Sequence, residues 1–134
     1  MITREPARAA VILAVHDVEE TRDGIEKLLS VDGYRVDPAR SEDDAVERAR
    51  RQRPDLILVS LAGLPVEVLL AAARIRQRAG LPDAVPVVVF CLPTIPEGEV
   101  VAMANNLYVI RPDSFDDLRA FLARLIAKVD ALSA

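Results

Sequence analysis

Short apolar runs and amphipathic segments alternate along the whole chain. Residues 10–15, 54–60, 85–90 and 107–110 each contain a run of consecutive apolar positions, which predicts strands buried on both faces. Residues 34–37 alternate between apolar and polar positions and predict a shorter strand near the edge of the sheet. The pattern therefore predicts five strands in one chain.

The segments between these strands predict helices over residues 18–31, 42–52, 66–79 and 97–105, and a final helix follows Ser114. Ser41 and Ser114 each precede an acidic residue by three positions, as N-cap residues often do. The final helix has the clearest apolar stripe at helical spacing: Leu118, Phe121, Leu122, Leu125, Ile126 and Val129.

Strands that alternate with helices predict a parallel sheet with helices on both faces. We therefore expect a three-layer α/β sandwich with five strands and five helices, a (βα)5 arrangement. Residues 9–131 form this single domain, and the polar residues 1–8 are expected to be a flexible N-terminus. The sequence shows no internal repeat and no second domain.

Composition narrows the class of protein. The 134 residues are 51% hydrophobic and 28% charged, as expected for a soluble globular domain. A net charge of -4 offers no basic surface for nucleic acid. The early apolar run over residues 9–15 is too short to span a membrane. We therefore expect a cytoplasmic protein that binds neither nucleic acid nor membrane.

Polar side chains gather where the first and third strands end. His16 and Asp17 follow the strand at residues 10–15, and Ser60 closes the strand at residues 54–60. Open α/β folds place their sites at this carboxyl edge of the sheet. The candidate site is therefore built around Ser60.

The chain resembles the receiver domains of response regulators in two-component signalling. Four strings carry the resemblance, and together they span most of the chain: residues 12–17, 54–61, 85–91 and 107–112, the last followed by Phe115. The resemblance implies a CheY-like, flavodoxin-like fold with strand order 2-1-3-4-5.

The residues at the receiver's functional positions differ from the family pattern. Ser60 stands at the position of the phosphate-accepting aspartate, and His16 replaces one of the two acidic residues, leaving Asp17. Cys91 takes the hydroxyl position, and Arg111 takes the lysine position. We therefore predict a degenerate pseudo-receiver that lacks the acceptor, has no cofactor, and binds Mg²⁺ weakly or not at all.

Further expectations concern the residues around this degenerate pocket. Arg111 is predicted to pair with Asp17 and fill the space. The resemblance implies a cis peptide before Pro112 and places Tyr108 at the aromatic switch position, where one fixed rotamer is expected. Cys91 at a strand end is interpreted as a small buried hydrophobe rather than a redox sensor.

The predicted function is phosphorylation-independent binding of a protein partner in a signalling pathway, with no enzymatic activity. The apolar segment 97–105 should leave surface for that partner, so Val100, Met103, Leu107 and Tyr108 are the predicted interaction face. The resemblance implies that the fourth helix, fifth strand and fifth helix also form a homodimer face.

Two alternatives remain open. The pocket of Ser60, Asp17 and Arg111 could respond to another modification or to a bound anion. A small hydrolase using His16, Asp17 and Ser60 is disfavoured, because neighbouring residues on a strand end point apart and no nucleophile-elbow glycines surround Ser60.

Overall fold

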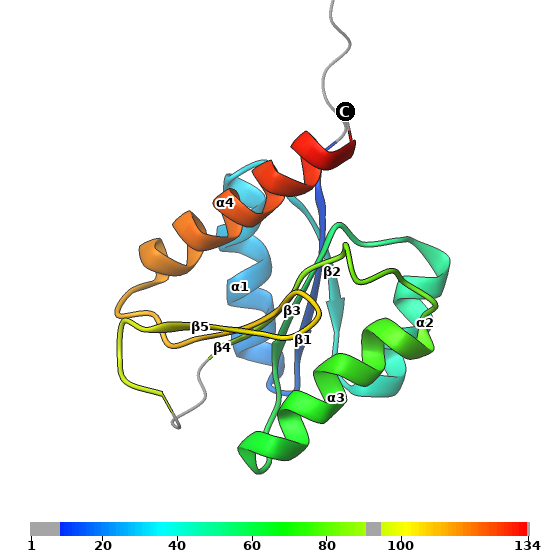
Figure 1. The fold of residues 1–134 in the computed structure, drawn as a ribbon, viewed down its shortest axis with the longest axis horizontal. Coiled ribbons are helices and arrows are strands. Elements are labelled where there is room, and N and C mark those ends of the chain that lie inside the picture. The colour runs from blue at the N-terminus through cyan, green and yellow to red at the C-terminus, as the bar shows by residue number, and fades with distance from the viewer. Residues whose placement is uncertain (1–8, 91–94, 134) are drawn as a thin grey trace, which may run out of the picture.

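In the computed structural model, residues 9–90 and 95–133 are described, and these contain six β-strands and four α-helices (Figure 1). The strands are β1 Val11–His16, β2 Arg35–Ala39, β3 Leu56–Ser60, β4 Val87–Phe90, β5 Val100–Met103 and β6 Leu107–Ile110. The helices are α1 Glu19–Val31, α2 Glu42–Arg51, α3 Pro65–Arg78 and α4 Phe115–Ser133. The predicted flexible segment 1–8 lies outside the described residues.

All six strands form one mixed sheet in the order β2-β1-β3-β4-β6-β5. The first five strands in this order are parallel, so the predicted order 2-1-3-4-5 is confirmed. The prediction of a purely five-stranded parallel sheet is wrong, because β5 adds a sixth strand antiparallel to β6.

The helix predicted over residues 97–105 is also wrong, because this segment contains β5 and the turn that joins it to β6. Asn105 and Asn106 both have positive φ values, 62° and 60°, which asparagine tolerates better than most residues. The two β-branched residues Val100 and Val101 favour an extended backbone. The local sequence therefore favours a hairpin.

Gly98 fixes where this hairpin begins. Its N–H donates to the Arg111 carbonyl, while the Arg111 N–H donates to the Glu99 carbonyl at 3.0 Å, so two residues face one across the ladder. Gly98 has a φ of 81°, the conformation that this kind of β-bulge requires at its first position. The bulge starts the pairing of β5 with β6.

The helix boundaries follow local sequence signals. The Ser41 hydroxyl accepts a hydrogen bond from the Asp44 N–H at 3.1 Å, which confirms the predicted N-cap of α2. The Ser114 hydroxyl accepts one from the Asp117 N–H at 3.3 Å at the start of α4. Pro65 occupies the first turn of α3, where its missing N–H costs nothing.

Helices α1 and α4 cover one face of the sheet and α2 and α3 cover the other (Figure 1). Each face has its own apolar core. We call the first the α1/α4 core; it includes Ile12, Leu29, Leu58, Ile110, Phe121 and Leu122. We call the second the α2/α3 core; it includes Leu13, Ile57, Val59, Ile75, Leu107 and Val109.

The β2 edge of the sheet carries a proline at a position that points away from β1. At the β2 edge, the Arg35 N–H donates to the Ala10 carbonyl. The backbone N–H and C=O groups of the odd-numbered residues of β2 therefore point toward β1, and those of the even-numbered residues point away from the sheet. Pro38 is therefore an outward-facing residue without an N–H.

Within the described residues, no helix is long and apolar enough to cross a membrane.

Candidate functional site

The predicted site residues His16, Asp17 and Ser60 do come together at the carboxyl ends of β1 and β3. His16 and Ser60 are direct neighbours across the parallel pair of these strands. Asp17 follows β1 directly and lies beside the loop after β3, which runs to the start of α3. Residues 44 positions apart in the chain thus share one edge of the sheet.

The Asp17 carboxylate is used to hold the loop after β3. Its Oδ2 atom accepts a hydrogen bond from the Ala62 N–H at 2.9 Å. Its Oδ1 atom lies 3.7 Å from Nδ1 of His16. The carboxylate of this edge therefore fixes the backbone two residues beyond Ser60.

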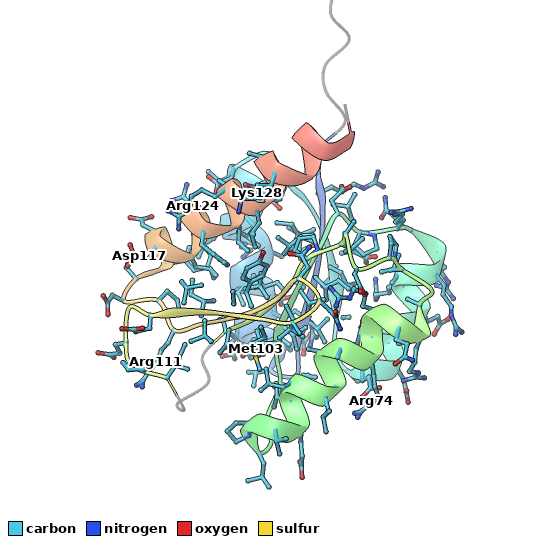
Figure 2. All side chains as sticks on the ribbon, in the orientation of Figure 1. Arg74, Met103, Arg111, Asp117, Arg124 and Lys128 are labelled. Atoms are coloured by element: carbon cyan, nitrogen blue, oxygen red, sulfur yellow. The ribbon has the colours of Figure 1, made fainter. Side chains whose placement is uncertain are left out.

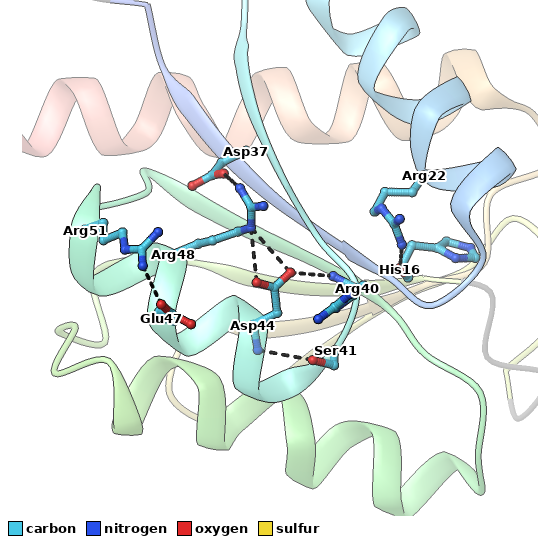
Figure 3. Close-up of polar contacts among 9 residues, drawn as sticks. All are labelled: His16, Arg22, Asp37, Arg40, Ser41, Asp44, Glu47, Arg48 and Arg51. Carbon is cyan, nitrogen blue, oxygen red and sulfur yellow. Dashed lines mark hydrogen bonds and ion pairs between the residues drawn. The ribbon is translucent and has the colours of Figure 1, made fainter.

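His16 is held through both its side chain and its backbone carbonyl. Its Nδ1 atom accepts a hydrogen bond from the Val18 N–H at 3.0 Å, so a neutral ring with its proton on Nε2 fits this contact. The ring centroid lies 6.4 Å from that of Phe90 at the end of β4. The Arg22 guanidinium on α1 donates to the His16 carbonyl at 2.7 Å, as Figure 3 shows.

Burial lowers the pKa of His16 below its ordinary value of 6.5; the nearby Asp17 opposes this shift, and Arg22 adds to it. The unfolded chain therefore takes up this proton at higher pH than the folded protein does. Protonation would also remove the Nδ1 acceptor that Val18 uses. Both effects favour the neutral imidazole in the folded state.

We expect the free energy of unfolding to decrease as the pH falls through 6.5 toward the lower folded pKa of His16. Urea denaturation at a series of pH values measures this. His16→Asn is the control, because the chain has a single histidine and the asparagine oxygen can replace Nδ1 as acceptor. An equal loss of stability in both proteins over this pH range would show that His16 is not the source of the pH dependence.

Arg111 does not join this cluster, so its predicted ion pair with Asp17 is wrong. The guanidinium donates to the Ile95 carbonyl at 3.1 Å and lies 3.9 Å from a Glu97 carboxylate oxygen. Figure 2 shows Arg111 at the edge of the molecule, near the start of β5. The bulge at Gly98 draws Arg111 into the hairpin and away from β1.

The remaining predicted site residues have different outcomes. Cys91 lies outside the described residues. Tyr108 on β6 is half-buried and packs edge-to-face on Phe121 of α4, with ring centroids 5.6 Å apart. None of the described peptide bonds is cis, so the cis bond expected before Pro112 is wrong.

The predicted interaction face divides into exposed and buried residues. Val100 and Met103 are exposed, although they lie on a strand rather than on the predicted helix. Leu107 is buried in the α2/α3 core, and Tyr108 is half-buried against α4. Val100 and Met103 therefore form the accessible part of this face, together with Val101.

The side chains at the carboxyl ends of β1 and β3 are a poor match for the magnesium ion that the receiver resemblance implies. Mg²⁺ requires near-octahedral oxygen ligands, usually including carboxylates. Here Asp17 is tied to a backbone amide, and its neighbours are an imidazole and a hydroxyl. Across residues 9–90 and 95–133, no group of three His, Cys, Asp or Glu side chains is placed to hold a metal.

Sequence reasoning missed two arginines, one at each end of the parallel strands. Arg22 anchors the end of β1 from α1. Arg76 on α3 is almost fully buried, and its guanidinium donates to the carbonyls of Val85, Asn105 and Asn106. Both arginines lie in helices where a charged residue normally indicates a solvent-exposed face, so the pattern gave no signal.

No protein-family model matches the chain, and no curated protein matches it significantly. Solved structures do match. One is the N-terminal domain of a response regulator/sensory box/GGDEF three-domain protein from Carboxydothermus hydrogenoformans, with TM-score 0.62, 22% identity, and coverage of 92% of this chain and 99% of that one.

Two further structures resemble the chain to a similar degree. The chemotaxis protein CheY4 from Vibrio cholerae has TM-score 0.62 and 20% identity, covering 88% of this chain and 99% of its own. A chain in the structure of the histidine kinase ThkA with the response regulator TrrA, a Thermotoga maritima protein, has TM-score 0.67 and 18% identity, covering 87% and 97%. The protein therefore has the CheY-like fold of receiver domains.

Proposed function

We propose that this protein is a receiver-type signalling domain that acts by binding a protein partner and does not depend on phosphorylation of an aspartate. One observation carries the proposal. The serine Ser60 ends β3 at the receiver acceptor position, and the neighbouring carboxylate of Asp17 is engaged by the Ala62 N–H. A hydroxyl cannot form the acyl phosphate that an aspartate forms.

The chemistry around Ser60 also argues against Ser60 as a nucleophile. A serine hydroxyl needs an adjacent base that can take its proton. The His16 Nδ1 atom already accepts the Val18 N–H, and the tautomer that fits this contact carries its proton on Nε2. This arrangement disfavours the hydrolase alternative and self-phosphorylation on Ser60 alike.

The anion alternative requires a cation in the pocket, and the contacts of Arg111 disfavour it. The guanidinium would have to leave the Ile95 carbonyl and Glu97 to reach an anion beside Asp17. Such an anion would also lie close to the Asp17 carboxylate, which repels it. Protein binding needs neither change.

The fold similarity supports a protein as the partner. The matched structure of ThkA with TrrA is a complex of a histidine kinase with a response regulator. In this protein, the exposed apolar residues Val100, Val101 and Met103 form a surface suited to contact with another protein. We propose this strand region as a protein contact surface of the domain.

We expect no covalent phosphorylation when the protein is incubated with acetyl phosphate and Mg²⁺. Intact-mass spectrometry measures the addition of a phosphoryl group. A receiver domain that keeps the aspartate acceptor is the positive control for the reagent. Phosphoryl addition to the wild-type protein that is absent in Ser60→Ala would contradict the proposal.

A further inference from the structure

The outer edge of β5 is uncovered. β5 is the last strand of the sheet, and within residues 9–90 and 95–133 no other strand pairs with its outer side. In Figure 1 it crosses the front of the molecule, with α4 on one side and α3 on the other. An exposed strand edge is a template for pairing with another strand.

The ladder with β6 fixes which backbone groups point outward. Glu99 is hydrogen-bonded with Arg111 across the ladder, and such pairs alternate along an antiparallel pair. The N–H and C=O groups of Val101 and Met103 therefore point toward β6. Val100 and Ala102 direct their N–H and C=O groups outward, so an added strand would find two residues ready to pair.

Apolar side chains extend from both faces of this edge. Val101 and Met103 lie opposite residues of the α2/α3 core, yet they are 40% and 45% exposed. Figure 2 shows Met103 on the side of the sheet toward α3. On the opposite face Val100, 42% exposed, lines a hollow of about 260 Å³ between β5 and α4.

The charge pattern of the segment indicates what can lie against it. Residues 100–106 carry no charge, and the acidic residues Glu97 and Glu99 both precede β5. Asn105 and Asn106 follow it. An antiparallel copy of the same segment therefore places the acidic end of each chain beside the amide end of the other, and like charges stay apart.

We propose that β5 pairs antiparallel with β5 of a second copy of this chain, joining two sheets into one. We place the two-fold axis at Ala102, where the same outward-facing residue of each copy meets. Val101 then lies opposite Met103 of the second copy, and Glu99 lies beside Asn105 of the second copy. Four exposed apolar side chains are covered, and small residues meet at the axis.

The alternative register, with Val101 on the axis, is less favourable. It would place Met103 directly opposite the carboxylate-bearing Glu99 of the second copy. Cross-strand pairs of matched polarity are the ones that stabilise a sheet. The register centred on Ala102 matches apolar with apolar across β5 and sets Glu99 near the turn residue Asn105 of the second copy.

The test is the oligomeric state by sedimentation velocity over a range of protein concentrations. We expect a monomer–dimer equilibrium, and we expect Ala102→Pro to raise the dissociation constant about tenfold or more. Proline removes an outward N–H and none of the donors that face β6. Val101→Lys should have a similar effect by placing a charge in the new contact.

The matched control is Val66→Lys. Val66 lies on α3, is also an exposed valine, and is outside the β5 edge. It should leave the dissociation constant unchanged. Circular dichroism checks folding of each variant; if Ala102→Pro does not fold, the exposed-site variant Val101→Lys decides the result.

Cross-linking tests the pairing directly. In a Cys91→Ser background, Ala102→Cys places its thiol at the axis, where facing Cα atoms about 5.5 Å apart permit a disulfide. Leu70→Cys, an exposed position on α3, is the control. We expect rapid disulfide dimerisation only of the Ala102→Cys protein.

A wild-type protein that stays monomeric at every concentration would overturn the proposal. So would a dimer that neither Ala102→Pro nor Val101→Lys weakens, or equal cross-linking at both cysteines. Binding of an extended segment from another protein to a monomeric chain would also overturn it. None of these outcomes depends on Ser60, so the phosphodonor experiment can fail or succeed separately.

Discussion

Leu58→Ala is expected to lower the free energy of unfolding by about 3–4 kcal/mol. Leu58 lies in the central strand β3, between Ala14 and Val88 of the neighbouring strands, and it is 1% exposed. Its side chain belongs to the α1/α4 core, which both helices close. Strands on both sides hold the backbone in place, so the surroundings can collapse only partly around the cavity.

Urea denaturation followed by circular dichroism measures this loss. Leu28→Ala is the matched control, because Leu28 on α1 is 48% exposed and the same atoms are removed. Its expected effect is within about 0.5 kcal/mol. Equal losses in the two variants would show that β3 does not hold the core in the way described.

Arg76→Met is expected to lower the free energy of unfolding by about 2–3 kcal/mol. The guanidinium of Arg76 donates to the Val85 carbonyl at 2.9 Å and to both carbonyls of the Asn105–Asn106 turn. Methionine keeps most of the apolar volume but leaves these carbonyls without their donor. Burial also lowers the pKa of Arg76, partly offset by Asp83 at 3.6 Å.

Arg74→Met is the control for the second prediction. Arg74 lies two residues earlier on α3, is half exposed, and pairs with Glu42 at 2.7 Å. An exposed ion pair of this kind contributes at most about 1 kcal/mol. Hydrogen exchange should also increase at the β5–β6 turn in Arg76→Met alone, and protection equal to wild type there would contradict the role assigned to Arg76.

The sequence predicted the parallel part of the fold well. Runs such as residues 56–59 and 87–90 are apolar at every position, and a strand buried on both faces is the simplest structure that accommodates them. Ser41 and Ser114 marked the starts of two helices. Hydrophobic pattern and capping chemistry act locally, so both were visible without the structure.

The segment 97–105 was misinterpreted because, as an apolar segment between two predicted strands, it was interpreted as a helix, although its local signals favour a hairpin. Gly98 before a β-branched pair and Asn105-Asn106 after it are turn residues at both ends of a short apolar run. The pattern of exposure also agrees with an edge strand, because Val100 and Met103 are exposed on opposite faces.

The site was predicted in part. Strand ends in a parallel sheet meet at one edge, so the closeness of His16, Asp17 and Ser60 followed from the topology. The partner of Arg111 did not, because the bulge at Gly98 decides where that side chain points. Bulges and buried arginines such as Arg76 depend on tertiary contacts that no local pattern records.

Pro38 sets a limit on how far the sheet can grow. Joining two copies through β5 leaves a β2 strand at each end of the twelve-stranded sheet, and the outward position of Pro38 has no N–H to offer a further strand. Each chain thus has one edge suited to pairing and one that resists it. In a dimer paired through β5, Pro38 would therefore hinder addition of a further copy at either end of the sheet.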